Sequence, residues 1–122
     1  MVRKPSVAFN KRRCLIIVTG FFTTYIEKGK LQTYLVHLKN HEPFCLGGIY
    51  NQLSDGFITC SLLVTKAPKS FKNIPNFNNQ KPLAITSVDY KKWLDSSNSF
   101  EELISFIKTH KTLEFEFTAI DD

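Results

Sequence analysis

The stretch from residue 12 to residue 26 constrains the fold more than any other part of the chain. Residues 14–18 read Cys-Leu-Ile-Ile-Val, a continuous apolar run of strand length, and Gly20 follows shortly afterwards. Residues 21–26 are rich in aromatic and β-branched side chains, which favour strands. The pattern predicts a strand covered on both faces, a bend at Gly20 and a second strand.

The remaining periodicities extend this pattern to an α+β fold. Further strands are expected at residues 31–38, 44–50 and 57–64. Short turns join them, so we expect residues 13–64 to form an antiparallel meander. Two helices follow, one capped by Ser87 and one that begins with a capping box of Ser99 and Glu102, and residues 113–117 alternate as a last strand. The predicted class is α+β, a mostly antiparallel sheet or partial barrel with two helices near the C-terminus.

A chain of 122 residues is the size of one small domain, and 43% hydrophobic residues are ample for a core. Basic residues crowd its start, so we divide it into a basic N-terminal arm at residues 1–12 and a single domain at residues 13–122. No apolar run approaches the ~20 residues of a membrane-spanning helix, and the basic start lacks the apolar segment and cleavage site of a signal peptide. We therefore expect a cytoplasmic protein with no membrane partner.

The three cysteines are Cys14, Cys45 and Cys60, an odd number, and each lies in an apolar stretch. We expect buried thiols that act as small hydrophobic side chains rather than a disulfide framework. His37 and His41 are four residues apart but straddle the end of a strand and a turn. This spacing does not resemble a metal site, and no metal or other cofactor is expected.

Charge is distributed unevenly along the chain, whose net charge is +5. Residues 1–13 carry five basic and no acidic side chains, whereas residues 95–122 carry two basic and seven acidic ones. The loop at residues 65–82 adds four lysines and no acid, with Phe71 and Phe77 between them. Cations release counterions from a phosphate backbone and aromatic rings stack on bases, so the pattern fits single-stranded nucleic acid. The alternatives are a solvated arm without a partner and phenylalanines that anchor the loop to the core.

The candidate phosphate contacts are basic side chains of the arm and the loop. They are Arg3, Lys4, Lys11, Arg12, Arg13, Lys66, Lys69, Lys72 and Lys81. Spacing alone shows no Ser-His-Asp candidate and no glycine-rich phosphate loop, and the paired Glu114 and Glu116 belong to a solvent face. The residues themselves therefore predict a small α+β domain with a possible nucleic-acid surface and no catalytic centre.

Several short motifs occur in a fixed order. They are Lys4-Pro5-Ser6, Arg13-Cys14-Leu15-Ile16, Gly20-Phe21-Phe22, Glu42-Pro43-Phe44, Gly47-Gly48-Ile49-Tyr50, Pro82-Leu83-Ala84-Ile85 and Trp93-Leu94. Their order and spacing resemble the SOS response-associated peptidase (SRAP) family from about Arg3 to Leu94. The resemblance implies a β-rich, barrel-like α+β fold that binds single-stranded DNA in the DNA damage response. It also implies a chemistry in which an N-terminal cysteine becomes covalently attached to abasic sites.

The residues at the family's functional positions depart from its pattern. The nucleophilic cysteine follows the initiator Met in the family, where this sequence has Val2. The family's active-site glutamate corresponds to Thr23, its histidine to Asn78 and its phosphate-binding arginine to Gln80. Valine has no lone pair for attack, threonine does not titrate near neutral pH and an asparagine amide does not shuttle protons. The resemblance thus implies a fold without its catalytic groups, and it adds Gln80 to the candidate nucleic-acid contacts.

Three functions are compatible with these observations. The first is a non-catalytic relative that binds single-stranded DNA or RNA or a protein partner. The second is a structural subunit of a larger protein or nucleoprotein assembly. The third, ranked last, is an active abasic-site crosslinker or peptidase, which would need a surface cysteine. The sequence begins after the family's N-terminal segment, so we also expect a protein partner or self-association to cover exposed sheet.

Overall fold

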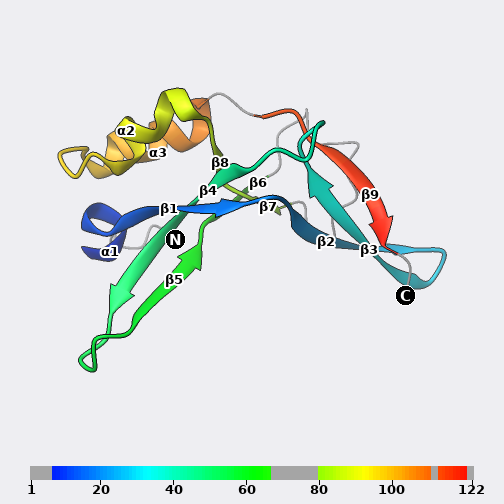
Figure 1. Cartoon of the computed structure of the whole chain (residues 1–122). Coiled ribbons are helices and arrows are strands. Elements are labelled where there is room, and N and C mark those ends of the chain that lie inside the picture. Colours follow the sequence, from blue (N-terminus) through cyan, green and yellow to red (C-terminus); the bar gives the residue numbers. More distant parts are fainter. Residues whose placement is uncertain (1–6, 67–79, 111–112, 121–122) are drawn as a thin grey trace.

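The computed structural model describes residues 7–66, 80–110 and 113–120. Its elements in chain order are α1 (Val7–Lys11), β1 (Arg13–Val18), β2 (Phe21–Glu27), β3 (Lys30–His37), β4 (Phe44–Gln52), β5 (Ile58–Leu62), β6 (Val64–Lys66), β7 (Gln80–Pro82), β8 (Ala84–Ile85), η2 (Ser87–Asp89), α2 (Tyr90–Leu94), α3 (Phe100–Thr109) and β9 (Glu116–Ile120) (Figure 1). The strands described here pair antiparallel and do not close into a barrel. The predicted α+β class is confirmed.

The strands form one sheet of order β1-β4-β5, with β8 also on β4, a second of order β2-β3-β9 and a β6–β7 ladder. The predicted meander is therefore wrong at two junctions, because β1 pairs with β4 and not with β2, and β3 pairs with β9 and not with β4. The chain changes sheet at Gly20, where a Cβ atom would lie only 2.8 Å from the carbonyl oxygen of Val36. This close approach places the start of β2 directly against β3.

The second predicted helix start is confirmed and the first is wrong. At α3, the amide of Glu102 donates to Ser99 Oγ and the amide of Ser99 donates to Glu102 Oε1, both at 3.1 Å. Ser87 is not a cap: it opens the 3-10 turn η2, which follows Thr86 without a side-chain capping bond. The amide of Asp89 bonds the carbonyl of Thr86 at 2.9 Å, which tightens the chain before α2 begins.

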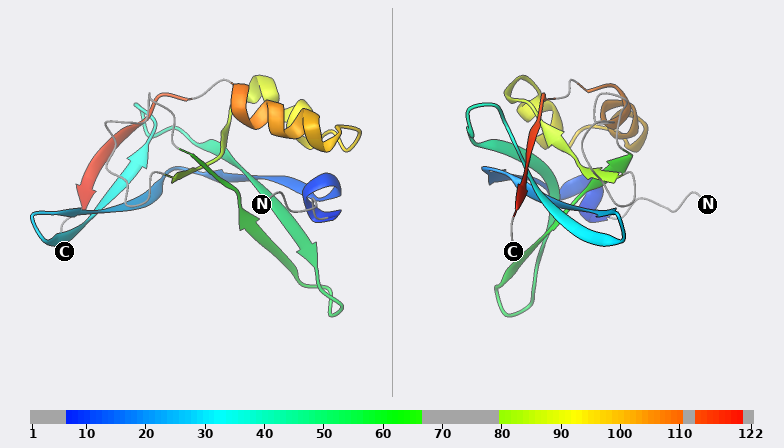
Figure 2. Two further views of the ribbon diagram at one scale, coloured as in Figure 1. Left: turned by 180° about the vertical axis from the view of Figure 1, so that it is seen from behind. Right: turned by 90° about the vertical axis from the view of Figure 1, so that its right-hand side faces the viewer.

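Two clusters of buried side chains make up the core. The first joins the two larger sheets and contains Phe21, Val36, Phe44, Leu46 and Ala84. The second lies between the β1-β4-β5 sheet and the helices and contains Leu83, Ile85, Trp93, Leu103 and Phe106. The left view of Figure 2 places α2 and α3 together at one end of the molecule, with β2, β3 and β9 at the other end. The β1-β4-β5 sheet therefore connects two separate packing centres.

The last strand is shifted from its predicted position. It runs over Glu116–Ile120 rather than residues 113–117. Leu113 and Phe115 pack against the first core cluster, but they precede β9. Phe117, which lies within β9, is 41% exposed. Among the described residues, no helix is long and apolar enough to cross a membrane.

Candidate nucleic-acid interface

The structure buries Arg13, which the sequence predicts to contact phosphate. Its Nε donates to the carbonyl oxygen of Trp93 at 2.6 Å, and its Nη1 donates to those of Phe9 and Asn10 at 2.7 and 2.8 Å. Its Nη2 donates to the carbonyl oxygen of Asp95. Burial lowers the pKa of the Arg13 guanidinium, and the carboxylate of Asp95 partly opposes that change. Arg13 thus joins α1, β1 and the end of α2, and only 7% of it is exposed.

Lys11 and Arg12 lie on the surface beside the β1-β4 pair. Lys11 is exposed at the end of α1, and Arg12 is half-buried. Arg12 Nε donates to the carbonyl oxygen of Tyr50 at 3.1 Å, and its Nη2 donates to Asn51 Oδ1 at 2.9 Å. Since guanidinium groups have five N–H donors, Arg12 keeps donors for an anion beyond these two bonds.

A second cationic position lies where β6 ends and β7 begins. Lys66 and Gln80 are exposed and directly opposite each other in the antiparallel register, and Thr65 pairs with Lys81. Lys81 is 3% exposed, and burial lowers the pKa of its amine. The structure therefore brings Lys66 and Gln80 together at the surface but turns Lys81 into the interior.

Thr23 is half-buried on β2, opposite Tyr34 of β3. The hydroxyl of Tyr34 donates to Glu27 Oε2 at 3.1 Å. Burial raises the pKa of Tyr34, and the hydrogen bond to Glu27 raises it further. Residues 23 and 27 lie on one face of β2, so strand alternation alone places Glu27 on the face of Thr23.

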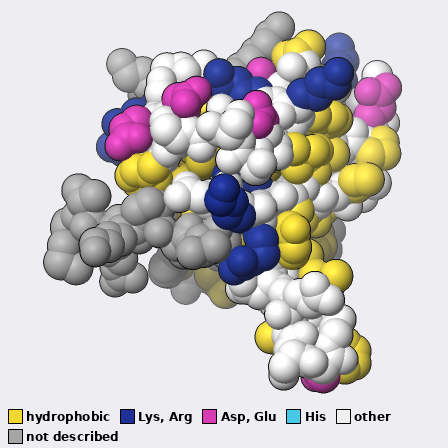
Figure 3. All heavy atoms as spheres, turned by 90° about the vertical axis from the view of Figure 1, so that its left-hand side faces the viewer, with side chains coloured by type: hydrophobic (Ala, Val, Ile, Leu, Met, Phe, Trp, Pro, Cys, Tyr) yellow, Lys and Arg dark blue, Asp and Glu magenta, His cyan; other side chains and the backbone are white. Residues whose placement is uncertain are grey.

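On the face drawn in Figure 3, the basic side chains of the described residues do not form one continuous surface. Seen from the left-hand side of Figure 1, they occupy separate positions, with acidic side chains among those at the top (Figure 3). Hydrophobic side chains lie along the projecting hairpin in the same view. The candidates that lie outside the described residues are Val2, Arg3, Lys4, Lys69, Lys72 and Asn78.

Comparison with protein families gives a match over residues 4–122 to the family described as SOS response associated peptidase (SRAP). The chain belongs to the SRAP family. No curated protein matches it.

Solved structures share the SRAP fold of this chain. A protein from Bacteroides thetaiotaomicron is 26% identical, with a TM-score of 0.79 over 94% of this chain and 52% of its own. A protein from Bordetella bronchiseptica is 14% identical, with a TM-score of 0.70 over 93% of this chain and 57% of its own. A phage-related protein from the same organism is 11% identical, with a TM-score of 0.66 over 95% of this chain and 56% of its own. This SRAP chain therefore spans about half the length of these proteins.

The cysteines of this SRAP chain are less buried than predicted. Cys45 is buried, but Cys14 is half-buried and Cys60 is exposed, because β5 lies at the edge of its sheet with little packed against it. Burial raises the pKa of the Cys14 thiol, and the neighbouring Cys60 thiol raises it further. The expectation of three buried thiols is wrong for Cys60.

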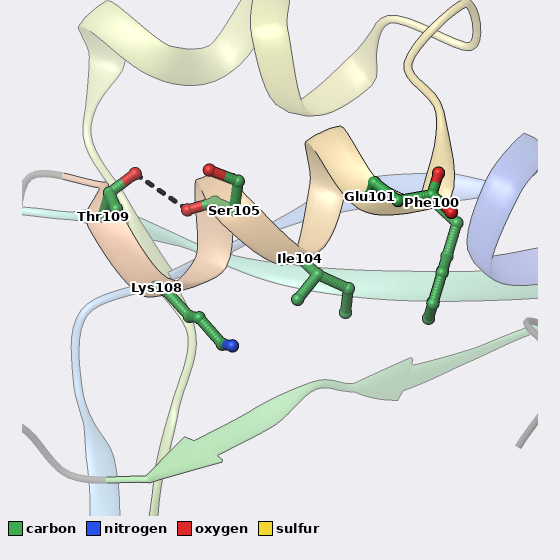
Figure 4. A pocket seen from close by; sticks show the side chains of 6 residues that line it. All are labelled: Phe100, Glu101, Ile104, Ser105, Lys108 and Thr109. Atoms are coloured by element: carbon green, nitrogen blue, oxygen red, sulfur yellow. Dashed lines mark hydrogen bonds between the residues drawn. The ribbon is translucent and has the colours of Figure 1, made fainter. Parts of the chain in front are cut away.

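The structure also shows a shallow cavity along α3 that the sequence did not reveal. Its volume is about 420 Å³, and its lining residues are Phe100, Glu101, Ile104, Ser105, Lys108 and Thr109. Phe100, Ile104 and Lys108 extend from one side of the helix (Figure 4). Within the described ranges, no three His, Cys, Asp or Glu side chains gather as metal ligands.

Proposed function

We propose that this SRAP-family chain is a non-catalytic module that binds single-stranded nucleic acid. One observation supports the proposal most directly: Lys66 lies directly opposite Gln80, and both are exposed. Gln80 occupies the position that the motif resemblance assigns to the family's phosphate-binding arginine. A lysine on the neighbouring strand would supply the positive charge that glutamine lacks, so phosphate binding would persist at this position with a changed residue.

The lack of catalysis is the other half of the proposal. The position of the family's glutamate is occupied by Thr23, whose hydroxyl cannot exchange protons near neutral pH. Glu27 is the carboxylate on the same strand face, and it accepts a hydrogen bond from Tyr34. A role in the DNA damage response follows from the name of the family and from the proposed binding to single strands.

The test is fluorescence anisotropy of a labelled single-stranded oligonucleotide at several salt concentrations. Replacing Lys66 with alanine should weaken binding and reduce the slope of log K against log salt by about 0.7, the value for one phosphate contact on a single strand. Lys108→Ala is the matched control, because Lys108 is an exposed lysine on α3, remote from Lys66 in sequence. Equal effects of the two substitutions would contradict the proposal.

A second candidate function is a structural subunit of a larger assembly. Exposed hydrophobic side chains favour it, among them Ile17 at 75%, Phe57 at 70% and Ile58 at 61% exposure. Large apolar side chains at the surface can form interaction sites, and Phe57 and Ile58 are adjacent in the chain. This function predicts negligible affinity for the free oligonucleotide at every salt concentration and a stable complex with a protein partner.

The third candidate, a covalent crosslinker, is favoured by the exposure of Cys60. A thiol on the surface can reach an aldehyde, whereas the buried Cys45 cannot. An adduct with abasic DNA that survives denaturing electrophoresis and disappears in Cys60→Ser would establish this activity. Cys45→Ser is the control, since its thiol lies inside the fold.

A further inference from the structure

Two of the three cysteines lie on the same face of the β1-β4-β5 sheet. Cys14 of β1 is directly opposite Gly48 of β4, and Cys60 of β5 is directly opposite Tyr50 of β4. Positions 48 and 50 are two residues apart in one strand, so they point to the same side of the sheet. Directly opposed residues also share a side. Cys14 and Cys60 therefore lie on one face, separated by the width of β4.

Gly48 keeps the space between the two cysteines free of a side chain. A Cβ atom at Gly48 would lie only 3.4 Å from Cys14 Sγ, so the Cys14 thiol already leans over β4. Burial raises the pKa of the Cys14 thiol, and the charge of Cys60 and a hydrogen bond between the two thiols raise it further. The two sulfur atoms are therefore neighbours, although β1 and β5 do not pair with each other.

The backbone separation of this pair does not suit a disulfide. Neighbouring strands are about 4.8 Å apart, so Cα atoms of β1 and β5, on either side of β4, are about 10 Å apart. A disulfide needs Cα atoms within roughly 7 Å of each other, and β4 would have to move aside to allow it. A metal ion between the thiols meets no such obstacle. Because metal–thiolate bonds are about 2.3 Å long, one ion in line with two sulfur atoms spans about 4.6 Å.

The number and type of available ligands select the ion. Within the part of the chain that the structure describes, no group of three His, Cys, Asp or Glu side chains includes this pair. Zinc takes four ligands, and magnesium and calcium take oxygen ligands. Copper(I) prefers soft thiolate ligands and is stable with two of them in a line. Ile58 and Leu62, two residues to either side of Cys60 on the same strand face, offer no competing oxygen.

We propose that Cys14 and Cys60 bind one copper(I) ion between them, above Gly48. Each thiol releases its proton to solvent as its sulfur–copper bond forms, so two protons leave and no electron is transferred. The exposed Cys60 is the point of entry, because Cys14 is half-buried. The bound ion would connect β1 to the edge strand β5 across β4. Copper binding at this pair is independent of the proposed nucleic-acid binding.

The test is a titration of the reduced protein with copper(I) under anaerobic conditions, against the coloured chelator bathocuproine disulfonate. The protein should take one ion per chain and develop a sulfur-to-copper charge-transfer band in the ultraviolet, and X-ray absorption should show two sulfur neighbours. Cys60→Ser and Cys14→Ser should each weaken binding at least about a hundredfold, since each removes one of two ligands.

The variants differ in their risk to the fold. Cys60 is exposed, so Cys60→Ser tests the site even where the half-buried Cys14 does not tolerate replacement. Cys45→Ala is the matched control. Cys45 is 7% exposed and is directly opposite Ile17, on the other face of the sheet, so its removal should leave the affinity for copper(I) unchanged.

Four outcomes would overturn the proposal. One is a chelator that keeps all the copper. Another is an affinity that Cys60→Ser does not change, which would place the ion elsewhere. The third is one ion per two chains, which would show that Cys60 residues of two copies share it. The fourth is a disulfide between Cys14 and Cys60 after treatment of the metal-free chain with diamide, which would make the pair a redox site. Oligonucleotide binding by the metal-free protein separates each result from a failure of the proposed function.

Discussion

The guanidinium of Arg13 lies over the ring of Trp93, with its Cζ atom 5.5 Å from the ring centroid. The two residues are also linked through the backbone: Arg13 Nε donates to the Trp93 carbonyl oxygen at 2.6 Å, and Trp93 Nε1 donates to the Cys14 carbonyl oxygen at 2.9 Å. Residues 80 positions apart thereby fix α2 against β1. The Arg13-Cys14 motif of this SRAP chain therefore has a structural role, because it holds α2 against β1.

Replacing Arg13 with lysine should destabilise the protein by about 3 kcal/mol. Lysine cannot reach the carbonyl groups of Phe9, Asn10, Trp93 and Asp95 together, and buried groups that lose their donors cost free energy. Urea denaturation measures the loss, and Lys11→Ala, at an exposed position, should change stability by less than about 0.5 kcal/mol. Similar stabilities for Arg13→Lys and the wild type would show that these bonds contribute little.

Replacing Gly48 with alanine should destabilise the fold more than replacing Gly56. A Cβ atom at Gly48 would lie 2.8 Å from the carbonyl oxygen of Ser61, a backbone atom that cannot move without separating β4 from β5. Gly56 has open space around it, but its φ of +93° is strained for any other residue. The substitution Gly56→Ala should therefore destabilise the protein by only about 1 kcal/mol. Thermal unfolding of the two variants compares these costs, and the reverse order would contradict the packing described here.

The burial of Lys81 predicts a rise in stability with pH. Its pKa in the folded protein lies below its ordinary value of 10.5, so between the two values the unfolded chain binds a proton that the folded chain does not. Stability therefore increases as pH rises through that interval. Lys81→Met should reduce this increase. The measurement is the free energy of unfolding against pH for the wild type and the variant. Taking the difference between the two profiles removes the contributions of tyrosine and cysteine titration, which both proteins share. Parallel pH profiles would mean that Lys81 is solvated.

Removing the capping box of α3 should cost about 1 kcal/mol. Ser99→Ala deletes the oxygen that accepts from the Glu102 amide at 3.1 Å and leaves that amide without its partner. Ser105→Ala on the same helix is the control, because alanine is a better helix former than serine. Chemical denaturation of both variants measures the difference, and an unchanged Ser99→Ala stability would show that the cap is redundant.

The sequence predicted β1 to β5 and the start of α3 because their signals are local, whereas β6, β7 and β8 were not predicted and β9 was misplaced. The apolar run at residues 14–18, the alternation in β3 and the capping box of α3 each depend on neighbouring residues. The order of strands in a sheet does not depend on neighbouring residues. No residue near β1 indicates that its partner is β4 rather than β2. The change of sheet at Gly20 depends on the close approach of Val36, which only the folded chain brings about.

The interface was harder to predict because charge alone does not reveal exposure. Arg13 and Lys81 are as basic as Lys66, but Arg13 is buried by contacts with Trp93 and Asp95, residues far along the chain. Cys60 looked buried from its apolar neighbours, although β5 has an open side. Long-range packing decided each of these cases.

Incubating the protein with a single-stranded oligonucleotide that contains one abasic site tests the central claim most directly. Anisotropy before denaturation and gel electrophoresis after it separate binding from covalent capture. The account predicts binding that weakens as salt rises and no band of shifted mobility on the denaturing gel. A covalent adduct, or an affinity for the strand that salt does not change, would contradict it.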